Sequence, residues 1–255
     1  MDSNNPFSVE GKVTIVTGGA TGIGAAIARE FAARGAPVLI ASRNEANLTK
    51  MRDQILAAGG RCEMTVCDVR EPAACEAMVA AAVRHFGRLD VMVNNAGAGF
   101  PTSTPKLSVN GWRTIVAINL EGTFFCSKAA AAQFLAQGGG GCIINLSSES
   151  ALEGWSDMPH YAAAKAGVIN LTMSHASEWG PKGIRVNCVI PGKIVTEMAD
   201  PIWLDPRATR HIAMRRFGQV NEIAFPCVFL ASDAASYING TTLMIAGGKN
   251  TGFGG

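Results

Sequence analysis

The sequence predicts an α/β protein with a doubly wound parallel β-sheet that carries helices on both faces. Short apolar runs rich in β-branched residues alternate along the chain with alanine-rich stretches of helical periodicity, which is the order of parallel βαβ units. These runs are continuously apolar, as expected for strands that are buried on both faces of a sheet. The first run also leads directly into a glycine-rich turn, which is typical of the start of such a fold.

Each predicted element has its own local signal. The helices expected at 23–34 and 46–58 are both followed by glycine, the residue that most often ends a helix, and the helix at 72–86 has proline in its first turn. The predicted strands are 13–17, 38–41, 62–67, 91–94, 142–147, 184–190 and 242–245, and the other predicted helices are 110–137, 159–179 and 224–230.

The bulk composition is that of one compact domain. The chain has 255 residues, of which 48% are hydrophobic and 16% charged, with no internal repeat and no linker, so residues 1–255 are expected to form a single domain. The net charge of +2 gives no basis for expecting nucleic acid or a membrane surface as a partner. Residues 198–214 mix proline, tryptophan and charge, fit no element, and are expected to form an insertion over the functional site.

The cysteines and the N-terminal sequence indicate a cytoplasmic protein without a metal site. The seven cysteines form no CxxC pair and no zinc-like group with the four histidines, which is typical of reduced thiols. The first twelve residues contain acidic residues and no apolar core, so they do not form a signal peptide, and no apolar run has membrane-spanning length.

The glycine-rich turn, Thr17–Gly24, is the first candidate binding feature. Glycines at the end of a strand let the backbone approach a pyrophosphate, and the N-terminus of the following helix attracts the anion. An ordinary strand–helix turn would explain a lone glycine motif equally well, but its position after the first strand of a βαβ unit favours dinucleotide binding. The residues expected to contact the cofactor here are Gly18, Thr21, Gly22, Ile23 and Gly24.

The end of the second predicted strand indicates which dinucleotide is bound. An acidic residue at this place would bind the ribose 2′-hydroxyl, but the chain has Ser42 and Arg43, and no carboxylate before Glu45. A guanidinium can bind a 2′-phosphate through two hydrogen bonds, so the sequence favours NADP(H) over NAD(H). The alternative is that Arg43 is an ordinary solvated arginine.

Tyr161 and Lys165 are the first candidate catalytic residues. Four residues apart on a predicted helix, they share one face, and the lysine ammonium would lower the pKa of the tyrosine. A pair this short is also typical of an ordinary helix surface. Ser147 and Ser148, at the end of the fifth predicted strand, each offer a hydroxyl that could hold a substrate oxygen while it gains charge.

With these motifs in order along the chain, the sequence resembles the short-chain dehydrogenase/reductase family. The family patterns TGxxxGxG, NNAG and PGxxxT match residues 17–24, 94–97 and 191–196, and the resemblance extends from Lys12 to about Gly248. It implies a Rossmann sheet of seven parallel strands and a nicotinamide dinucleotide. It also implies a homotetramer or homodimer built on the helices around 110–137 and 159–179.

The resemblance also assigns roles to single residues. It favours Ser148 over Ser147 as the catalytic serine, thirteen residues before Tyr161, and it gives Asn119 the role of kinking its helix and ordering a water that leads to Lys165. Asn119 could instead be a buried structural residue. Asp68 could cap the helix at Pro72 as well as meet the adenine, since the two roles are compatible. The further cofactor contacts that it implies are Asp68, Val69, Asn95, Ala96, Gly97, Tyr161, Lys165, Pro191, Gly192, Ile194 and Thr196.

The expected reaction is hydride transfer between NADP(H) and a ketone or secondary alcohol, with Tyr161 as general acid or base. A medium-sized apolar ketone is the expected substrate, with a 3-oxoacyl thioester as the second candidate. Lys193 and Arg207 could meet an anionic substrate end or be solvated. An enoyl-thioester reductase and a non-catalytic NADP(H)-binding sensor are the alternatives. The residues expected to contact substrate are Phe100, Ser148, Ser150, Trp155, Tyr161 and Trp203.

Overall fold

The computed structural model describes residues 5–197 and 206–248 and has a seven-stranded parallel sheet at its centre. The strand order is β3-β2-β1-β4-β5-β6-β9, and every neighbouring pair is parallel, which confirms the predicted doubly wound Rossmann-type sheet. The strands are β1 (Thr14–Thr17), β2 (Val38–Ser42), β3 (Cys62–Val66), β4 (Val91–Asn94), β5 (Gly141–Leu146), β6 (Ile184–Pro191) and β9 (Thr242–Ile245).

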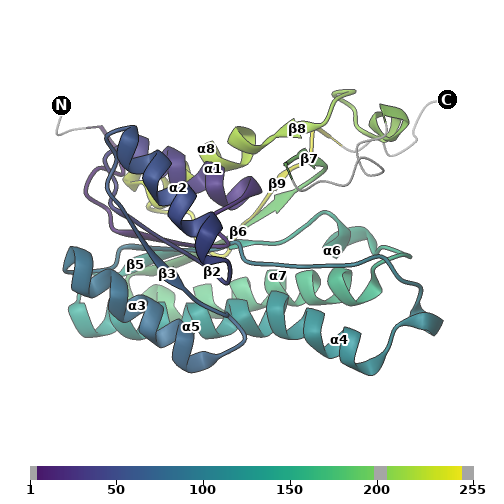
Figure 1. The fold of residues 1–255 in the computed structure, drawn as a ribbon, viewed down its shortest axis with the longest axis horizontal. Helices are drawn as coiled ribbons and strands as arrows, with labels where there is room; N and C mark the ends of the chain where they lie inside the picture. The colour runs from purple at the N-terminus through teal and green to yellow at the C-terminus, as the bar shows by residue number, and fades with distance from the viewer. Residues whose placement is uncertain (1–4, 198–205, 249–255) are drawn as a thin grey trace.

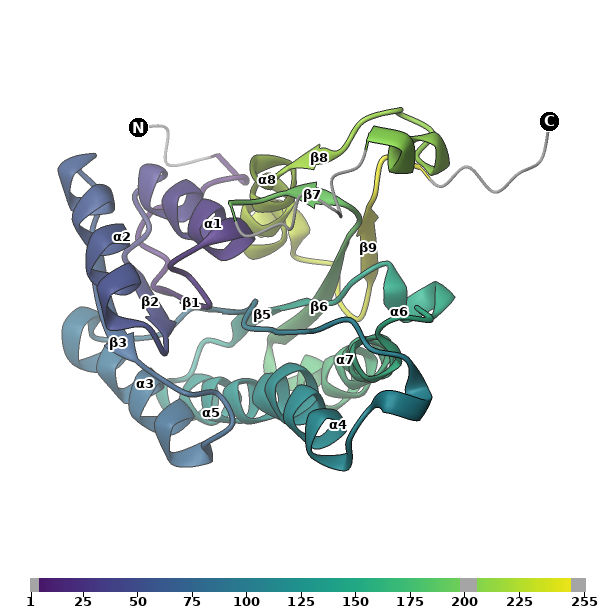
Figure 2. The ribbon, with the colours of Figure 1, turned by 45° about the vertical axis from the view of Figure 1, so that its right-hand side comes forward.

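Helices cover both faces of the sheet, so the molecule has three layers (Figure 1). The helices α1, α2 and α8 lie on one face, and α3, α4, α5 and α7 lie on the other, as Figure 2 also shows. A separate apolar core fills the space between the sheet and each helical layer. The bounds are α1 (Gly22–Ala33), α2 (Glu45–Ala57), α3 (Pro72–Phe86), α4 (Val109–Val116), α5 (Gly122–Gln137), α6 (Ser150–Glu153), α7 (Pro159–Trp179) and α8 (Val220–Ala231).

The prediction of one regular helix over 110–137 is wrong. A π-helical turn, η2 (Ala117–Glu121), separates α4 from α5. The side-chain amide of Asn119 donates to the carbonyl oxygens of Ile115, at 2.9 Å, and Ala98, at 2.7 Å, so it takes an acceptor from the helix backbone. A side chain that enters the backbone ladder in this way is a recognised cause of a bulge, and the disturbance expected at Asn119 lies where it was predicted.

The late helix begins earlier than predicted, at Val220 instead of 224. Gln219 and Glu222 form a reciprocal capping box at its N-terminus, in which the Glu222 carboxylate accepts from the Gln219 backbone N–H at 2.8 Å. The apolar periodicity starts only after this capping turn, so the sequence pattern placed the start of the helix too late.

Two short strands that the sequence did not predict flank the 198–214 segment. β7 (Ile194–Val195) and β8 (Gly218–Gln219) pair in parallel as a separate two-stranded sheet. Between them the structure describes a 3-10 helix, η5 (Pro206–His211), and backbone hydrogen bonds from Ala213 and Met214 to Gly248 and Gly247. The segment 198–205, which includes Trp203, lies outside the described residues.

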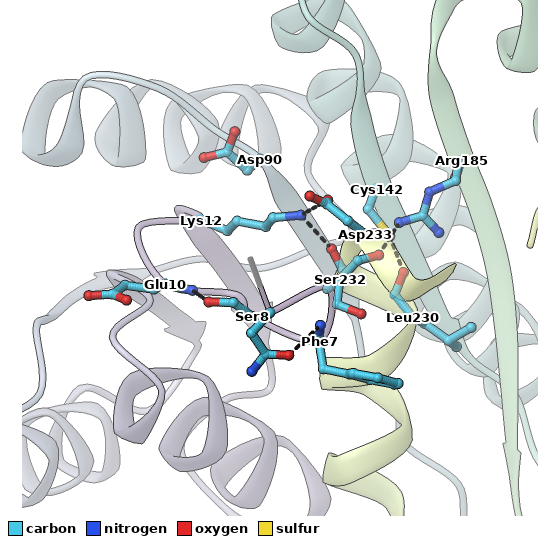
Figure 3. Close-up of polar contacts among 12 residues, drawn as sticks. Phe7, Ser8, Glu10, Lys12, Asp90, Cys142, Arg185, Leu230, Ser232 and Asp233 are labelled. Atoms are coloured by element: carbon cyan, nitrogen blue, oxygen red, sulfur yellow. Dashed lines mark hydrogen bonds and ion pairs between the residues drawn. The ribbon is translucent and has the colours of Figure 1, made fainter. Parts of the chain in front are cut away.

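Lys12 connects the start of the chain to the end of α8 (Figure 3). Its ammonium donates to the Ala231 carbonyl oxygen at 3.1 Å and pairs with the Asp233 carboxylate at 2.7 Å. A cation at a helix C-terminus is favourable because the last carbonyl groups lack partners within the helix. Cys142 on β5 donates to the Leu230 carbonyl in the same place, and all seven cysteines of the chain are buried free thiols.

Candidate active site

A cavity of about 920 Å³ lies at the carboxyl ends of the central strands. The order of the strands reverses between β1 and β4, which is where ligands bind in open α/β sheets. The cavity is lined by Gly18, Ala20, Thr21, Gly22, Ile23, Gly24, Ala41, Ser42, Arg43, Asn44, Asn47, Cys67, Asp68, Val69, Asn95, Ala96, Gly97, Ala98, Gly99, Pro101, Ile118, Ser148, Glu149, Trp155, Met158, Tyr161, Gly192, Lys193, Ile194 and Thr196.

The glycine turn between β1 and α1 forms one wall of this cavity. Gly18 has φ +63° and Gly22 has φ +55°, both in the left-handed region that glycine adopts without strain. A Cβ on Gly24 would overlap the Gly18 carbonyl and the Asn95 amide, so only glycine allows α1 to start this close to β4. The free backbone N–H groups at the start of α1 therefore face the cavity and can bind an anion.

Asn95 fixes the glycine turn in place. Its side-chain amide donates to the carbonyl oxygens of Thr17, at 2.9 Å, and Gly18, at 3.3 Å. The Thr17 hydroxyl in turn accepts from the backbone N–H groups of Asn95 and Ala96, both at 3.0 Å. Asn94 is buried below the cavity and binds Ser127 and Asn145, as expected for a structural strand end.

Four polar residues from the end of β2 and the start of α2 line the far end of the cavity. Arg43 is exposed and forms no ion pair with any other residue in the described ranges 5–197 and 206–248. Asn44 caps α2 by accepting from the Asn47 backbone N–H at 3.0 Å. These two asparagines were not predicted as lining residues, although an asparagine directly before a helix is a recognisable cap signal. Ser42 completes the set.

Asp68 lines the cavity beside Val69 and is held by Arg70. The Arg70 guanidinium pairs with the carboxylate at 2.5 Å, and this hydrogen-bonded contact lowers the pKa of Asp68 below its usual value. Glu71 occupies the N-cap position of α3, whose N-terminus has no side-chain capping hydrogen bond, so the prediction that Asp68 could cap this helix is wrong. Its side chain is instead oriented at the edge of the cavity.

Tyr161 and Ser148 lie together in the cavity wall. Burial raises the pKa of Tyr161, and the hydrogen bond that its hydroxyl forms with Ser148 opposes part of that rise. The Ser148 hydroxyl also accepts from the Ser150 backbone N–H at 3.3 Å and lies 3.0 Å from the Ser150 hydroxyl. Two hydroxyl groups, one from the end of β5 and one from α7, can therefore meet a single substrate oxygen.

Lys165 lies behind Tyr161, one turn further along α7. Its ammonium is 5.7 Å from the centre of the tyrosine ring and donates to the Leu146 carbonyl at 2.8 Å. Only 3% of the residue is exposed, and this burial lowers the pKa of Lys165 to about 8.

Asn119 and Lys165 converge on Gly97, at the end of β4. A Cβ on Gly97 would lie 2.8 Å from the Asn119 side-chain oxygen and 3.4 Å from the Lys165 nitrogen. Neither Asn119 nor Lys165 lines the cavity itself. Asn119 and Lys165 therefore form a second layer of side chains behind Gly97 and Tyr161. Because Gly97 has no side chain, this second layer can approach β4.

The two adjacent serines have different environments. The Ser147 hydroxyl is buried and donates to the Lys165 carbonyl at 2.9 Å, which ties β5 to α7. Of the two, only Ser148 lines the cavity. The structure therefore gives Ser147 a packing contact and presents Ser148 to a ligand.

The predicted substrate contacts are only partly brought together. Trp155 lines the cavity with Ser148 and Tyr161, whereas Ser150 is buried behind Ser148 and does not line it. Phe100 points elsewhere, because its ring packs edge-on against His160 with centroids 4.6 Å apart. Pro191, a predicted cofactor contact, is buried at the end of β6 and likewise lines no part of the cavity.

The geometry fits a dinucleotide. The cavity extends from the start of α2, past the glycine turn, to Tyr161, so one wall can hold an adenosine, a pyrophosphate and a second ring in sequence. Gly18, Gly22 and Gly24 have no side chains, which leaves room for a pyrophosphate against the backbone of the turn. The turn can be this tight only with glycine, because a Cβ at Gly18 or Gly24 would overlap Asn95 or the Gly18 carbonyl. Gly97 lines the cavity near Lys165, and Thr196 lies beside Gly22 in the glycine turn.

Comparison with known proteins identifies the family. Residues 18–250 match the family described as Enoyl-(Acyl carrier protein) reductase. The chain is 38% identical to the D-threitol dehydrogenase of Mycolicibacterium smegmatis, with 95% of this chain and 94% of that protein covered. It is 39% identical to a Bacillus subtilis protein named as a probable 2,4-dienoyl-CoA reductase, with 94% and 97% covered.

A solved structure supports the same relationship. A short-chain type dehydrogenase/reductase from Mycobacterium marinum superposes with a TM-score of 0.91 at 32% identity, covering 96% of this chain and 98% of that chain. The sequence match and this structural match each extend over almost the whole chain, and the relatives named are oxidoreductases. The protein belongs to the short-chain dehydrogenase/reductase family, whose members bind nicotinamide cofactors.

Proposed function

We propose that the protein is an NADP(H)-dependent oxidoreductase that interconverts a ketone and a secondary alcohol. The observation that carries this proposal is the pairing of the Ser148 and Tyr161 hydroxyl groups in the cavity wall, with Lys165 directly behind the tyrosine. A hydroxyl pair of this kind can hold a carbonyl oxygen and deliver a proton to it as charge develops.

The bound dinucleotide would supply the hydride in reduction and accept it in oxidation. In reduction, the Ser148 hydroxyl holds the substrate oxygen, and the Tyr161 hydroxyl donates the proton that converts it to an alcohol. The Lys165 ammonium stabilises the phenolate that remains on Tyr161. Asn119 holds the backbone around Ala98 through two hydrogen bonds and so keeps the second layer in register with the cavity.

The choice of NADP(H) rests on the far end of the cavity. Arg43 lines it without an ion partner in residues 5–197 and 206–248, so its guanidinium is available for a 2′-phosphate. Asp68, the acidic side chain among the lining residues at this end, is already paired with Arg70. Glu45 is exposed and lies outside the lining, so it offers no carboxylate to a ribose hydroxyl.

A homo-oligomer is part of the same proposal. Large apolar side chains are exposed on the helical layer formed by α4, α5 and α7, which is the layer expected to form a subunit contact. Trp112 on α4, Phe124 on α5 and Met173 on α7 are 42%, 40% and 47% exposed. Burial of these side chains against a second copy would remove them from water.

A thioester-dependent reductase of carbon–carbon double bonds is the second candidate function. It is favoured by the family description and by the dienoyl-CoA reductase relative. A silent NADP(H)-binding sensor is the third, but it would have no use for a tyrosine, serine and lysine assembled in one cavity.

One assay separates these functions. Purified protein is incubated with NADPH or NADH and a panel of ketones, 3-oxoacyl thioesters and 2-enoyl thioesters, and with the oxidised dinucleotides and a panel of alcohols. The proposal expects turnover with ketones and alcohols and higher catalytic efficiency with NADPH. Turnover restricted to enoyl thioesters would replace it with the second function, and dinucleotide binding without any turnover would replace it with the third.

A further inference from the structure

The substrate end of the cavity contains a carboxylate that the proposed reaction does not use. Glu149 follows Ser148 directly, and its half-buried side chain lines the cavity together with Lys193, Trp155 and Met158. A carboxylate has about four acceptor sites and no donor, so it can accept from a ligand in addition to contacts within the protein. A ligand that displaces water from it without donating a hydrogen bond pays the desolvation cost. The ligand of this cavity is therefore expected to supply a donor near Ser148.

The backbone fixes Glu149 beside the loop that follows β6. Its N–H donates to the Pro191 carbonyl at 3.1 Å. A Cβ on Gly192 would lie 3.2 Å from a Glu149 carboxylate oxygen and 2.7 Å from both the Cα and the Cβ of Ala246. The carboxylate thus lies over a glycine, and a bulkier residue at position 192 would displace it.

Ala246 also lies on the side of Gly192 where a Cβ would stand, and it carries no charge. An acidic residue there would place a second carboxylate close to the first, and two adjacent carboxylates cannot both remain ionised at low cost. Alanine at position 246 avoids this repulsion. Glu149, which directly follows Ser148 and lines the cavity, is therefore the acidic side chain beside Gly192 in the described residues.

We propose that Glu149 determines substrate specificity by accepting a hydrogen bond from a hydroxyl on the carbon next to the reacting carbon. The substrates would then be vicinal diols and polyols, and their α-hydroxyketones in the reverse direction. Ser148 and Glu149 are consecutive in the chain and both line the cavity, so a small molecule held by Ser148 can place a second oxygen near Glu149. This inference rests on the proposed function.

The charges around the cavity distinguish hydroxyl groups from other polar groups. Lys193 lines the same end of the cavity, so the ligand meets a cation as well as an anion. A hydroxyl both donates and accepts, so a polyol can satisfy Glu149 and Lys193 together. An amine would satisfy only the carboxylate, an acid only the ammonium, and an acyl chain neither. Phe100, which would have made the wall more apolar, packs on His160 instead.

The test compares matched pairs of substrates. For the wild-type protein, kcat/KM is measured for meso-2,3-butanediol and for 2-butanol, which lacks only the second hydroxyl. Because hydrogen bonds to charged groups are the stronger ones, we expect a preference of about 10- to 100-fold for the diol. Glu149→Leu should abolish this preference by lowering kcat/KM for the diol more than kcat/KM for 2-butanol, and Glu149→Gln should weaken it.

Glu153→Gln on α6, outside the cavity lining, is the matched control and should keep the wild-type preference. Dinucleotide binding by each variant shows that it has folded. Equal kcat/KM for diol and 2-butanol in the wild type would overturn the inference while leaving the proposed function intact. A Glu149→Leu variant that loses both activities equally, or a wild type that prefers 1-amino-2-propanol to 1,2-propanediol, would also overturn it. If the wild type oxidises no alcohol, the proposed function itself fails.

Discussion

In the proposed reaction, the protonation of Tyr161 couples the direction of the reaction to pH. Burial raises the pKa of this phenol, so it is protonated near neutral pH and available as an acid for carbonyl reduction. Alcohol oxidation needs the phenolate as a base. We therefore expect kcat/KM for oxidation to increase with pH, and kcat/KM for reduction to fall only as pH rises through the pKa of Tyr161 in the loaded enzyme.

In the proposed reaction, Lys165 determines the pH at which this transition occurs. Burial lowers the pKa of its ammonium to about 8, and while charged the ammonium would stabilise the phenolate. Lys165→Met removes that charge, so the rise in oxidation rate should move to higher pH by about one unit or more, since one unit corresponds to ~1.4 kcal/mol. The pH profile of kcat/KM for alcohol oxidation measures this, and a profile that keeps its wild-type midpoint would contradict the role of Lys165.

Arg43 should determine which dinucleotide is used. Arg43→Ala removes the guanidinium that is proposed to bind the 2′-phosphate, so KM for NADPH should rise at least ~10-fold while KM for NADH changes little. Arg84→Ala, on the exposed face of α3, is a control for the loss of an arginine elsewhere. If the ratio of the two kcat/KM values stays at the wild-type level in Arg43→Ala, Arg43 is only a solvated residue.

At the scale of elements, Gly97 joins β4 to the π-helical turn and to α7. Its backbone φ is not positive, so alanine is conformationally allowed, but the added Cβ would lie 2.8 Å from the Asn119 oxygen and 3.4 Å from the Lys165 nitrogen. Gly97→Ala should therefore displace this second layer and lower kcat by about 10- to 100-fold, because small displacements at a reacting site have effects of this size.

The control for Gly97→Ala is a glycine whose substitution strains the backbone without blocking anything. Gly59 has φ +82°, and a Cβ added to it would meet no atom within 4 Å, so Gly59→Ala should reduce stability and leave kcat unchanged. The measurement is kcat of both variants by steady-state kinetics, with dinucleotide binding as a check of folding. Wild-type kcat in Gly97→Ala would show that the close approach of Asn119 and Lys165 is unimportant.

The sequence predicted most elements because their signals are local. The apolar runs and helix-ending glycines placed the strands of the central sheet and most helices within about two residues, since burial on both faces is visible in the residues themselves. The π-helical turn could be predicted only as a disturbance at Asn119, because one of the two carbonyl groups that hold the Asn119 amide, that of Ala98, belongs to a distant loop. The same limit applies to β7 and β8, which are only two residues long each.

In the candidate site, too, the residues placed by local sequence could be predicted and those placed by distant packing could not. Motif residues at strand ends, such as Gly18, Asn95 and Ser148, line the cavity because the topology carries every strand end to one edge. Ser150 and Phe100 were expected in the cavity because they adjoin such residues in sequence. Their side chains face a neighbouring hydroxyl and His160 instead, and the direction of a loop side chain depends on packing that no local pattern records.

At the scale of the whole molecule, the exposed face of α5 and α7 predicts self-association. Phe124 and Met173 contribute large exposed side chains to this face. Phe124→Glu combined with Met173→Glu places two charges in the proposed contact, so the variant should elute as a smaller species than the wild type in size-exclusion chromatography with light scattering.

Leu56→Glu, on α2 at 47% exposure, is the control for adding a charge to an exposed apolar site on the opposite layer. It should keep the mass of the wild type. A monomeric wild type, or a double variant with unchanged mass, would show that subunits do not meet through this face.

The most direct test of Tyr161 as the general acid is the turnover of Tyr161→Phe. This change removes one hydroxyl, keeps the ring that packs beside Gly99, and leaves the glycine turn untouched. NADPH binding, followed by fluorescence titration, should be nearly unchanged, while kcat for ketone reduction should fall by about 10²- to 10⁴-fold through loss of the proton donor. Wild-type turnover in Tyr161→Phe would contradict the assignment of Tyr161 as the general acid.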